Sequence, residues 1–165
     1  MNLLTHFYLT IRLYFKSLKT KWMSTKSLVL LVFQFLTMGY LLSGFSISIS
    51  SWILVVQSIG IVIALSGISA GGIHGFNMQP EVKSDVLITN GIYRYIRNPM
   101  YLGILLFFSA DLLSRPTLTR MIAFVILIVT LFLKILSEER FLSIKFGDDY
   151  AQYKSTSYRL IPFVY

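Results

Sequence analysis

Charged, amide and tyrosine side chains gather in three short stretches of this otherwise apolar chain, and these are the places where chemistry could occur. In chain order the stretches carry Tyr93, Arg94, Tyr95, Arg97 and Asn98; Glu138 and Glu139; and Tyr150, Tyr153, Tyr158 and Arg159. Guanidinium groups bind carboxylates, carboxylates bind amino groups and hydroxyls, and aromatic rings stack on flat groups. Brought together, these side chains would suit a zwitterionic ligand with a flat ring. The isolated His6 and His74 support neither a metal site nor a His-centred triad.

The elements that position these stretches are predicted to be membrane helices. Of the 165 residues, 55% are hydrophobic and 13% are charged, whereas soluble domains carry about 25% charged residues. The surplus apolar side chains must face lipid. Residues 1–26 hold five basic residues and no acidic one beside an apolar helical face, which predicts an amphipathic helix at the membrane interface.

Two uncharged segments, residues 28–49 and 52–73, are each long enough to cross a bilayer, because a hydrocarbon core of ~30 Å needs about 20 helical residues. Glycines and serines in the second segment favour close packing against a neighbouring helix. Gln34 and Gln57 are expected to hydrogen-bond between helices.

Downstream, the pattern predicts a polar loop over residues 74–98 and then a helical hairpin. Pro99 suits the first position of a short helix, which ends near residue 114. A longer helix begins at about Leu118 and continues past the two glutamates. Gly147 can end it, ahead of a short C-terminal helix.

The positions of the basic residues predict the orientation. Twelve of the 15 Lys and Arg residues lie in the leader, the loop and the tail, so both termini and the site are expected on the cytoplasmic side of an inner membrane. The +8 charge then requires no nucleic acid. We expect an all-α integral membrane protein with about four transmembrane helices, the interfacial helix and a short cytoplasmic C-terminal helix. It forms a single membrane domain over residues 1–165, made of the leader (1–26), two helices (28–73), and the loop, hairpin and tail (74–165).

The two helices of the hairpin differ in length, which predicts a pocket. At 1.5 Å per residue, the acidic pair should extend beyond the start of the shorter helix by about 9 Å. The walls under this overhang would be the end of the loop, the N-terminus of the short helix, the two glutamates and the tail.

Residues 91–103, with the sequence GIYRYIRNPMYLG, Glu138-Glu139, the FGDDY run at 146–150 and Arg159-Leu-Ile-Pro162 together resemble the isoprenylcysteine carboxyl methyltransferase family and its phospholipid methyltransferase relatives. The resemblance covers about residues 71–162. It implies an integral membrane enzyme that uses S-adenosyl-L-methionine and acts on a lipophilic, isoprenoid-like or lipid substrate. Family members usually have His at the position of Asn98 and often Pro at that of Ile92, and an asparagine cannot titrate.

By this resemblance, the start of the short helix meets the cofactor, Gly103 permits its close approach, one of the glutamates holds ribose hydroxyls or the amino group, and an arginine holds a carboxylate. The implied catalytic residues are Arg97, Glu139 and Arg159. The implied cofactor-binding residues are Tyr93, Arg94, Tyr95, Asn98, Pro99, Tyr101, Gly103, Glu138, Glu139 and Tyr150.

Two other functions remain open at this point. Membrane sterol and steroid reductases that use NADPH carry a similar C-terminal pattern, with Asn where this chain has Met100. A membrane adaptor without catalytic activity would also fit, given Asn98. Oligomeric state, acceptor atom and the division of roles among the arginines do not follow from the sequence.

Overall fold

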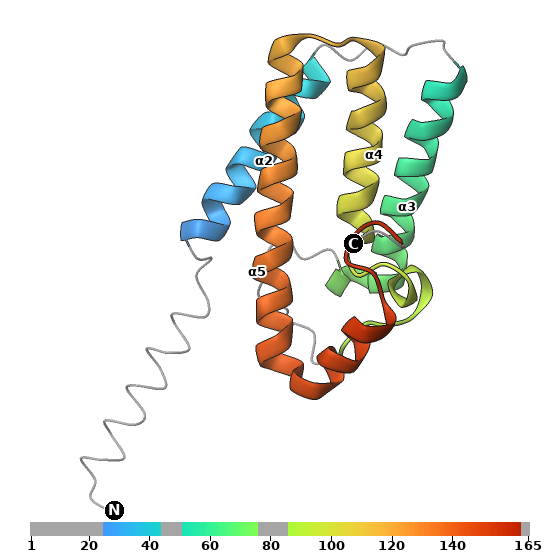
Figure 1. Cartoon of the computed structure of the whole chain (residues 1–165), viewed down its shortest axis with the longest axis vertical. Helices are drawn as coiled ribbons and strands as arrows, with labels where there is room; N and C mark the ends of the chain where they lie inside the picture. Colours follow the sequence, from blue (N-terminus) through green and yellow to red (C-terminus); the bar gives the residue numbers. More distant parts are fainter. Residues whose placement is uncertain (1–24, 44–50, 76–85, 163–165) are drawn as a thin grey trace, which may run out of the picture.

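The computed structural model describes residues 25–43, 51–75 and 86–162, and the side chains of residues 71–75 are not part of that description. Helix α2 spans Thr25–Ser43, α3 spans Ser51–Gly75, α4 spans Pro99–Ser114 and α5 spans Leu118–Thr156, with a short 3₁₀ helix, η1, over Gly91–Arg94 (Figure 1). Residues 1–24, where most of the interfacial helix is expected, lie outside the described residues. Residues 76–85 of the predicted 74–98 loop lie outside them too. The described part is an all-helical membrane protein, as the composition predicted.

Helices α2, α3 and α5 are long and apolar enough to cross a membrane, and α4 is a shorter apolar helix of 16 residues. The boundaries follow the predicted signals. Pro99 opens α4, and the Thr117 side chain accepts a hydrogen bond from the Arg120 amide at the start of α5. Gly147 breaks α5 with a φ of 52°, so a short helix folds back after it. The first span is described as far as Ser43, and its predicted continuation to residue 49 lies outside the described residues.

Helices α3 and α4 pack against each other through small residues. A Cβ atom added to Gly103 of α4 would lie 2.4 Å from the Gly60 carbonyl oxygen and 2.7 Å from the Ala64 Cβ of α3. A Cβ atom on Gly67 would lie 2.9 Å from Pro99 Cγ. Small side chains allow membrane helices to approach this closely. The expected role of Gly67 and its neighbours in close packing is confirmed.

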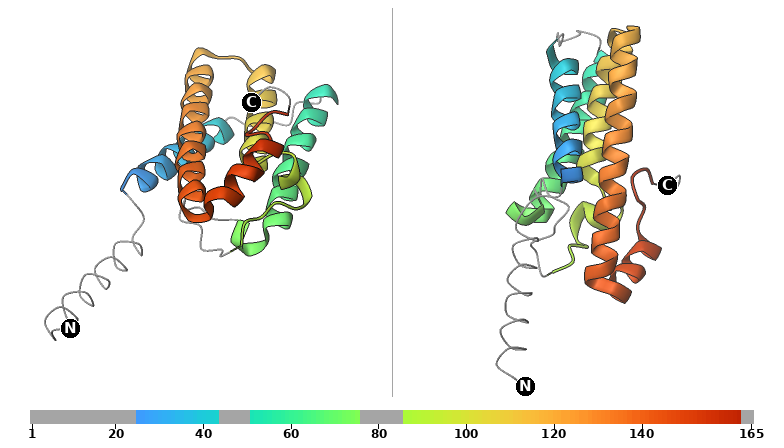
Figure 2. Two further views of the ribbon diagram at one scale, coloured as in Figure 1. Left: turned by 60° about the horizontal axis from the view of Figure 1, so that its bottom comes forward. Right: turned by 90° about the vertical axis from the view of Figure 1, so that its left-hand side faces the viewer.

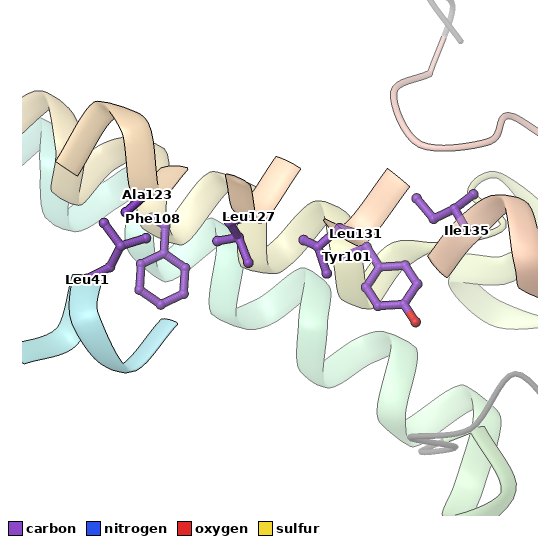
Figure 3. Packing of buried hydrophobic residues seen from close by; sticks show 7 residues of the cluster. All are labelled: Leu41, Tyr101, Phe108, Ala123, Leu127, Leu131 and Ile135. Carbon is purple, nitrogen blue, oxygen red and sulfur yellow. The ribbon is translucent and has the colours of Figure 1, made fainter. Parts of the chain in front are cut away.

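The buried core lies along one stripe of α5. Ala123, Leu127, Leu131 and Ile135 recur every four residues, so they share one face of the helix. They pack against Tyr101 and Phe108 of α4 and Leu41 of α2 (Figure 3).

Two groups of polar contacts lie at opposite ends of the helix bundle. At the α4–α5 turn, Asp111 accepts hydrogen bonds from Arg115 and from Arg120, and Arg120 also donates to the Leu41 carbonyl of α2. At the other end, residues 86–98 meet the segment that follows Gly147 (Figures 1 and 2). The Arg-Asn-Pro turn and the twin glutamates are therefore at the same end.

Candidate functional site

The C-terminal tail is fastened to the turn that precedes α4. The Arg97 amide donates to the Tyr158 carbonyl at 2.8 Å, and the Tyr158 amide donates to the Tyr95 carbonyl at 2.9 Å. The Asn98 side-chain amide donates to the Arg159 carbonyl at 2.8 Å. Asn98 thus positions the tail through a hydrogen bond that needs no titratable group.

Glu139 is the centre of a buried ionic cluster. Its Oε1 accepts from Arg97 Nε at 3.0 Å, and its Oε2 accepts from Arg159 Nε at 2.9 Å. The Glu139 and Arg97 side chains are 7% and 9% exposed, and that of Arg159 is 18% exposed. Arg97 also donates to the carbonyl oxygens of Lys154 and Ser157. The three predicted catalytic residues come together, and in this arrangement both carboxylate oxygens of Glu139 bind arginines of the chain itself.

Glu138 faces a different neighbour. The Tyr101 hydroxyl donates to Glu138 Oε1 at 2.5 Å, which joins the start of α4 to α5. Successive residues of a helix point about 100° apart. Glu138 therefore lies against α4 while Glu139 holds the tail, and the two carboxylates are not interchangeable.

Tyrosines from the loop and the tail line the cluster. The Tyr153 hydroxyl donates to the Tyr93 carbonyl at 2.7 Å, and the Tyr150 and Tyr153 rings meet edge to face with centroids 6.0 Å apart. Tyr150 is 1% exposed, and its buried hydroxyl has no hydrogen-bond partner among the described residues. Burial, and secondarily the charge of Glu138, raises the pKa of Tyr93 above its ordinary value, so its hydroxyl is harder to ionise than that of an exposed tyrosine.

Four predicted cofactor residues lie differently from the rest. Tyr95 is 61% exposed and the Arg94 guanidinium sits 6.0 Å from its ring centroid, so both face away from the buried cluster. The close approach expected of a cofactor at Gly103 is made by α3 instead, because the Gly60 and Ala64 backbone fills that space. The sequence could not show this, since a glycine permits approach by any partner. Pro99 is also buried against α3.

Sequence reasoning missed Lys134 as a functional candidate. This residue of α5 is 6% exposed, and its ammonium donates to Gln34 Oε1 of α2 at 2.8 Å. The interhelical role predicted for Gln34 is thereby confirmed. The signal was present, because a single lysine within an apolar membrane segment marks a functional site by default.

Sequence comparisons relate this chain to known methyltransferases. The chain is 29% identical over 119 residues to methanethiol S-methyltransferase 1 of Bradyrhizobium diazoefficiens. The aligned region covers 71% of this chain and 40% of that protein. The chain thus spans less than half the length of that curated relative. The sequence model of the phospholipid methyltransferase family matches residues 34–149, from within α2 to just beyond Gly147. Because this match covers more than half of its residues, the chain belongs to the phospholipid methyltransferase family.

Proposed function

We propose that this protein is a membrane methyltransferase that transfers a methyl group from S-adenosyl-L-methionine to a lipophilic acceptor. The observation that carries the proposal is the convergence of Arg97 and Arg159 on Glu139, beside the Tyr101–Glu138 hydrogen bond. Three stretches far apart in the sequence thereby supply anionic, cationic and aromatic groups at one end of the bundle. This set fits a zwitterionic ligand with a flat ring.

The side chains fit such a cofactor in specific ways. Tyr150 offers a buried hydroxyl with no partner among the described residues, a group that costs free energy unless a ligand or water satisfies it. Arg159, the more exposed of the two arginines on Glu139, suits the cofactor carboxylate. Glu138, bound to one hydroxyl, retains acceptor capacity for an amino group or ribose hydroxyls.

The cofactor supplies a methyl group on a sulfonium, so the protein's task is alignment and exclusion of water. The Glu139 cluster fixes the tail across the start of α4 and keeps this end of the bundle dry. Tyr101 holds Glu138 in one orientation. Asn98 holds the Arg159 carbonyl and takes no proton, so any proton that an acceptor loses must leave by another group or by water.

The acceptor is proposed to enter from the bilayer, because the helices beside the site face lipid with apolar side chains such as Leu133 and Leu136. The relative's name states a thiol as its methyl acceptor. We further propose one membrane domain, with this end on the cytoplasmic side of an inner membrane, since twelve of the 15 Lys and Arg residues belong to the leader, loop and tail.

Ligand binding tests the proposal directly. A ligand that binds only the folded protein raises its melting temperature, and the rise grows with the logarithm of the ratio of ligand concentration to Kd. S-adenosylhomocysteine should raise the melting temperature of the purified full chain in detergent, and NADP should not. Stabilisation by NADP alone would identify a reductase instead, and stabilisation by neither would indicate an adaptor without catalytic activity.

A further inference from the structure

The turn between α4 and α5, at the end of the bundle opposite to the tail, carries two arginines and one carboxylate (Figure 1). Asp111 accepts a hydrogen bond from Arg115 at 3.0 Å and another from Arg120. The side chains of Asp111 and Arg120 are 2% and 9% exposed, so this pair is withdrawn from water. One carboxylate neutralises one guanidinium, and the turn therefore keeps one positive charge.

No other carboxylate lies near enough to balance that charge within the described part of the chain. Residues 27–80, which include α2, α3 and their connection, contain no Asp or Glu, and Asp111 is the only acidic residue from 86 to 137. The next one, Glu138, lies about 30 Å beyond Leu118 along α5, at 1.5 Å per residue. At that distance it does not neutralise the arginines of the turn. The balancing anion has to come from outside the chain.

The two arginines divide the work at this turn. Arg120 donates to Asp111 and also to the Leu41 carbonyl of α2 at 3.0 Å, so two neighbouring helices fix its position. The Arg115 side chain is 33% exposed and shares Asp111 with Arg120. The Nε–H groups of both guanidiniums are buried and have no hydrogen-bond partner among the described residues, although buried donors normally have one. Arg120 thus neutralises Asp111, and Arg115 is the arginine that can present its charge to an external anion.

The turn also lies where the lipid-facing apolar surface of the hairpin ends. Leu113 and Leu118 flank the arginine-containing turn and are 64% and 73% exposed, and exposed Met121 and Ile122 continue that surface along α5. A phospholipid beside these side chains would place its acyl chains along them and its phosphate at the level of Arg115. A guanidinium suits this group, because its planar fork of N–H donors matches phosphate oxygens. A free inorganic anion would make no use of the exposed leucines.

We propose that the α4–α5 turn binds the phosphodiester of an anionic phospholipid through Arg115, in the leaflet opposite to the proposed cofactor site. Asp111 and Arg120 form the buried support of this site. Because Arg120 is also bound to the Leu41 carbonyl, a lipid held here stabilises the junction of α2, α4 and α5. The site makes no use of methyl transfer, so it stands or falls separately from the proposed function.

The experiment compares four ligands that share only parts of an anionic phospholipid. Full-length protein, freed of lipid in a non-ionic detergent, is given dioleoylphosphatidylglycerol, dioleoylphosphatidylcholine, dioleoylglycerol or inorganic phosphate. The melting temperature is measured, and native mass spectrometry counts the lipids retained per chain. The measurements are repeated with Arg115→Gln, in which Asp111 keeps its partner Arg120, and with the control Lys145→Met, which removes an exposed lysine from the other end of α5.

Dioleoylphosphatidylglycerol should raise the melting temperature of wild type, and one molecule should stay bound per chain. The zwitterionic lipid, the lipid without phosphate and inorganic phosphate should each have a clearly smaller effect. Arg115→Gln should lower the affinity for dioleoylphosphatidylglycerol about fivefold or more, because one basic residue beside an anionic lipid contributes about that factor. Lys145→Met should bind this lipid like wild type.

Stabilisation of wild type by dioleoylglycerol or dioleoylphosphatidylcholine to the same extent would overturn the inference, because apolar contact alone would explain it. An equal effect of inorganic phosphate would identify a site for a soluble anion and overturn the lipid assignment. Unchanged lipid affinity in Arg115→Gln, or an equal loss in Lys145→Met, would remove the role of Arg115. The comparison of ligands on wild type remains decisive even if Arg115→Gln does not fold.

Discussion

The substitution Glu139→Gln removes one charge from the centre of the buried cluster while preserving side-chain size. Arg97 and Arg159 then lose the carboxylate that each contacts, at 3.0 and 2.9 Å. Breaking a buried ion pair by removing one partner costs about 3–5 kcal/mol, and the partial exposure of Arg159 puts the expected loss at the lower end, about 3 kcal/mol. Because this cluster is the ionic part of the contacts that hold the tail, beside its backbone and Asn98 hydrogen bonds, the loss should appear as local opening of the tail.

Amide hydrogen exchange measures that opening. The Tyr158 amide, which donates to the Tyr95 carbonyl, should exchange about 100-fold faster in Glu139→Gln, since every 1.4 kcal/mol is a factor of ten. Glu138→Gln is the matched control, because this neighbouring carboxylate binds Tyr101 and not the tail. Tail exchange that stays at the wild-type rate in Glu139→Gln, or rises as much in Glu138→Gln, would refute the reasoning.

Three further substitutions test separate contacts. Gly103→Ala should destabilise the protein by about 1–3 kcal/mol because its Cβ overlaps α3, whereas Gly39→Ala, with nothing within 4 Å of its Cβ, should not; equal melting temperatures would contradict the close packing. Tyr150→Phe should leave the melting temperature unchanged and lower S-adenosylhomocysteine affinity roughly fivefold to tenfold by calorimetry, since its hydroxyl has no partner among the described residues; unaltered affinity would exclude it from the site. Asn98→His keeps a donor for the Arg159 carbonyl and should preserve tail protection, whereas Asn98→Leu should lose about 1 kcal/mol of it; loss in both would mean that the amide itself is required.

The helices were predictable because lipid imposes a strong compositional rule on the segments that cross it. The start of α4 at Pro99, the continuation of α5 beyond Glu139 and the break at Gly147 each had a local signal. The meeting of the Arg-Asn-Pro turn with the glutamates followed from helix direction alone, since an even number of spans separates the loop from the tail.

Pairwise contacts were not predictable in the same way. Adjacent glutamates look equivalent in the sequence, yet one binds Tyr101 and the other binds two arginines, because their side chains leave the helix in different directions. The partner of Gly103 depends on where α3 lies, which is set by tertiary packing. The contact between Lys134 and Gln34 likewise depends on where α2 lies against α5, although a lone lysine in an apolar segment is visible in the sequence.

The central claim is that the tail end of the bundle binds a sulfonium methyl donor, and photolabelling tests it most directly. Radiolabelled S-adenosylmethionine is crosslinked by ultraviolet light to the purified full chain, with and without excess S-adenosylhomocysteine, and the labelled peptides are identified. We predict competable label within residues 93–101 or 138–159. Competable label confined to the opposite end, around residues 111–120, or no competable label at all, would contradict the account.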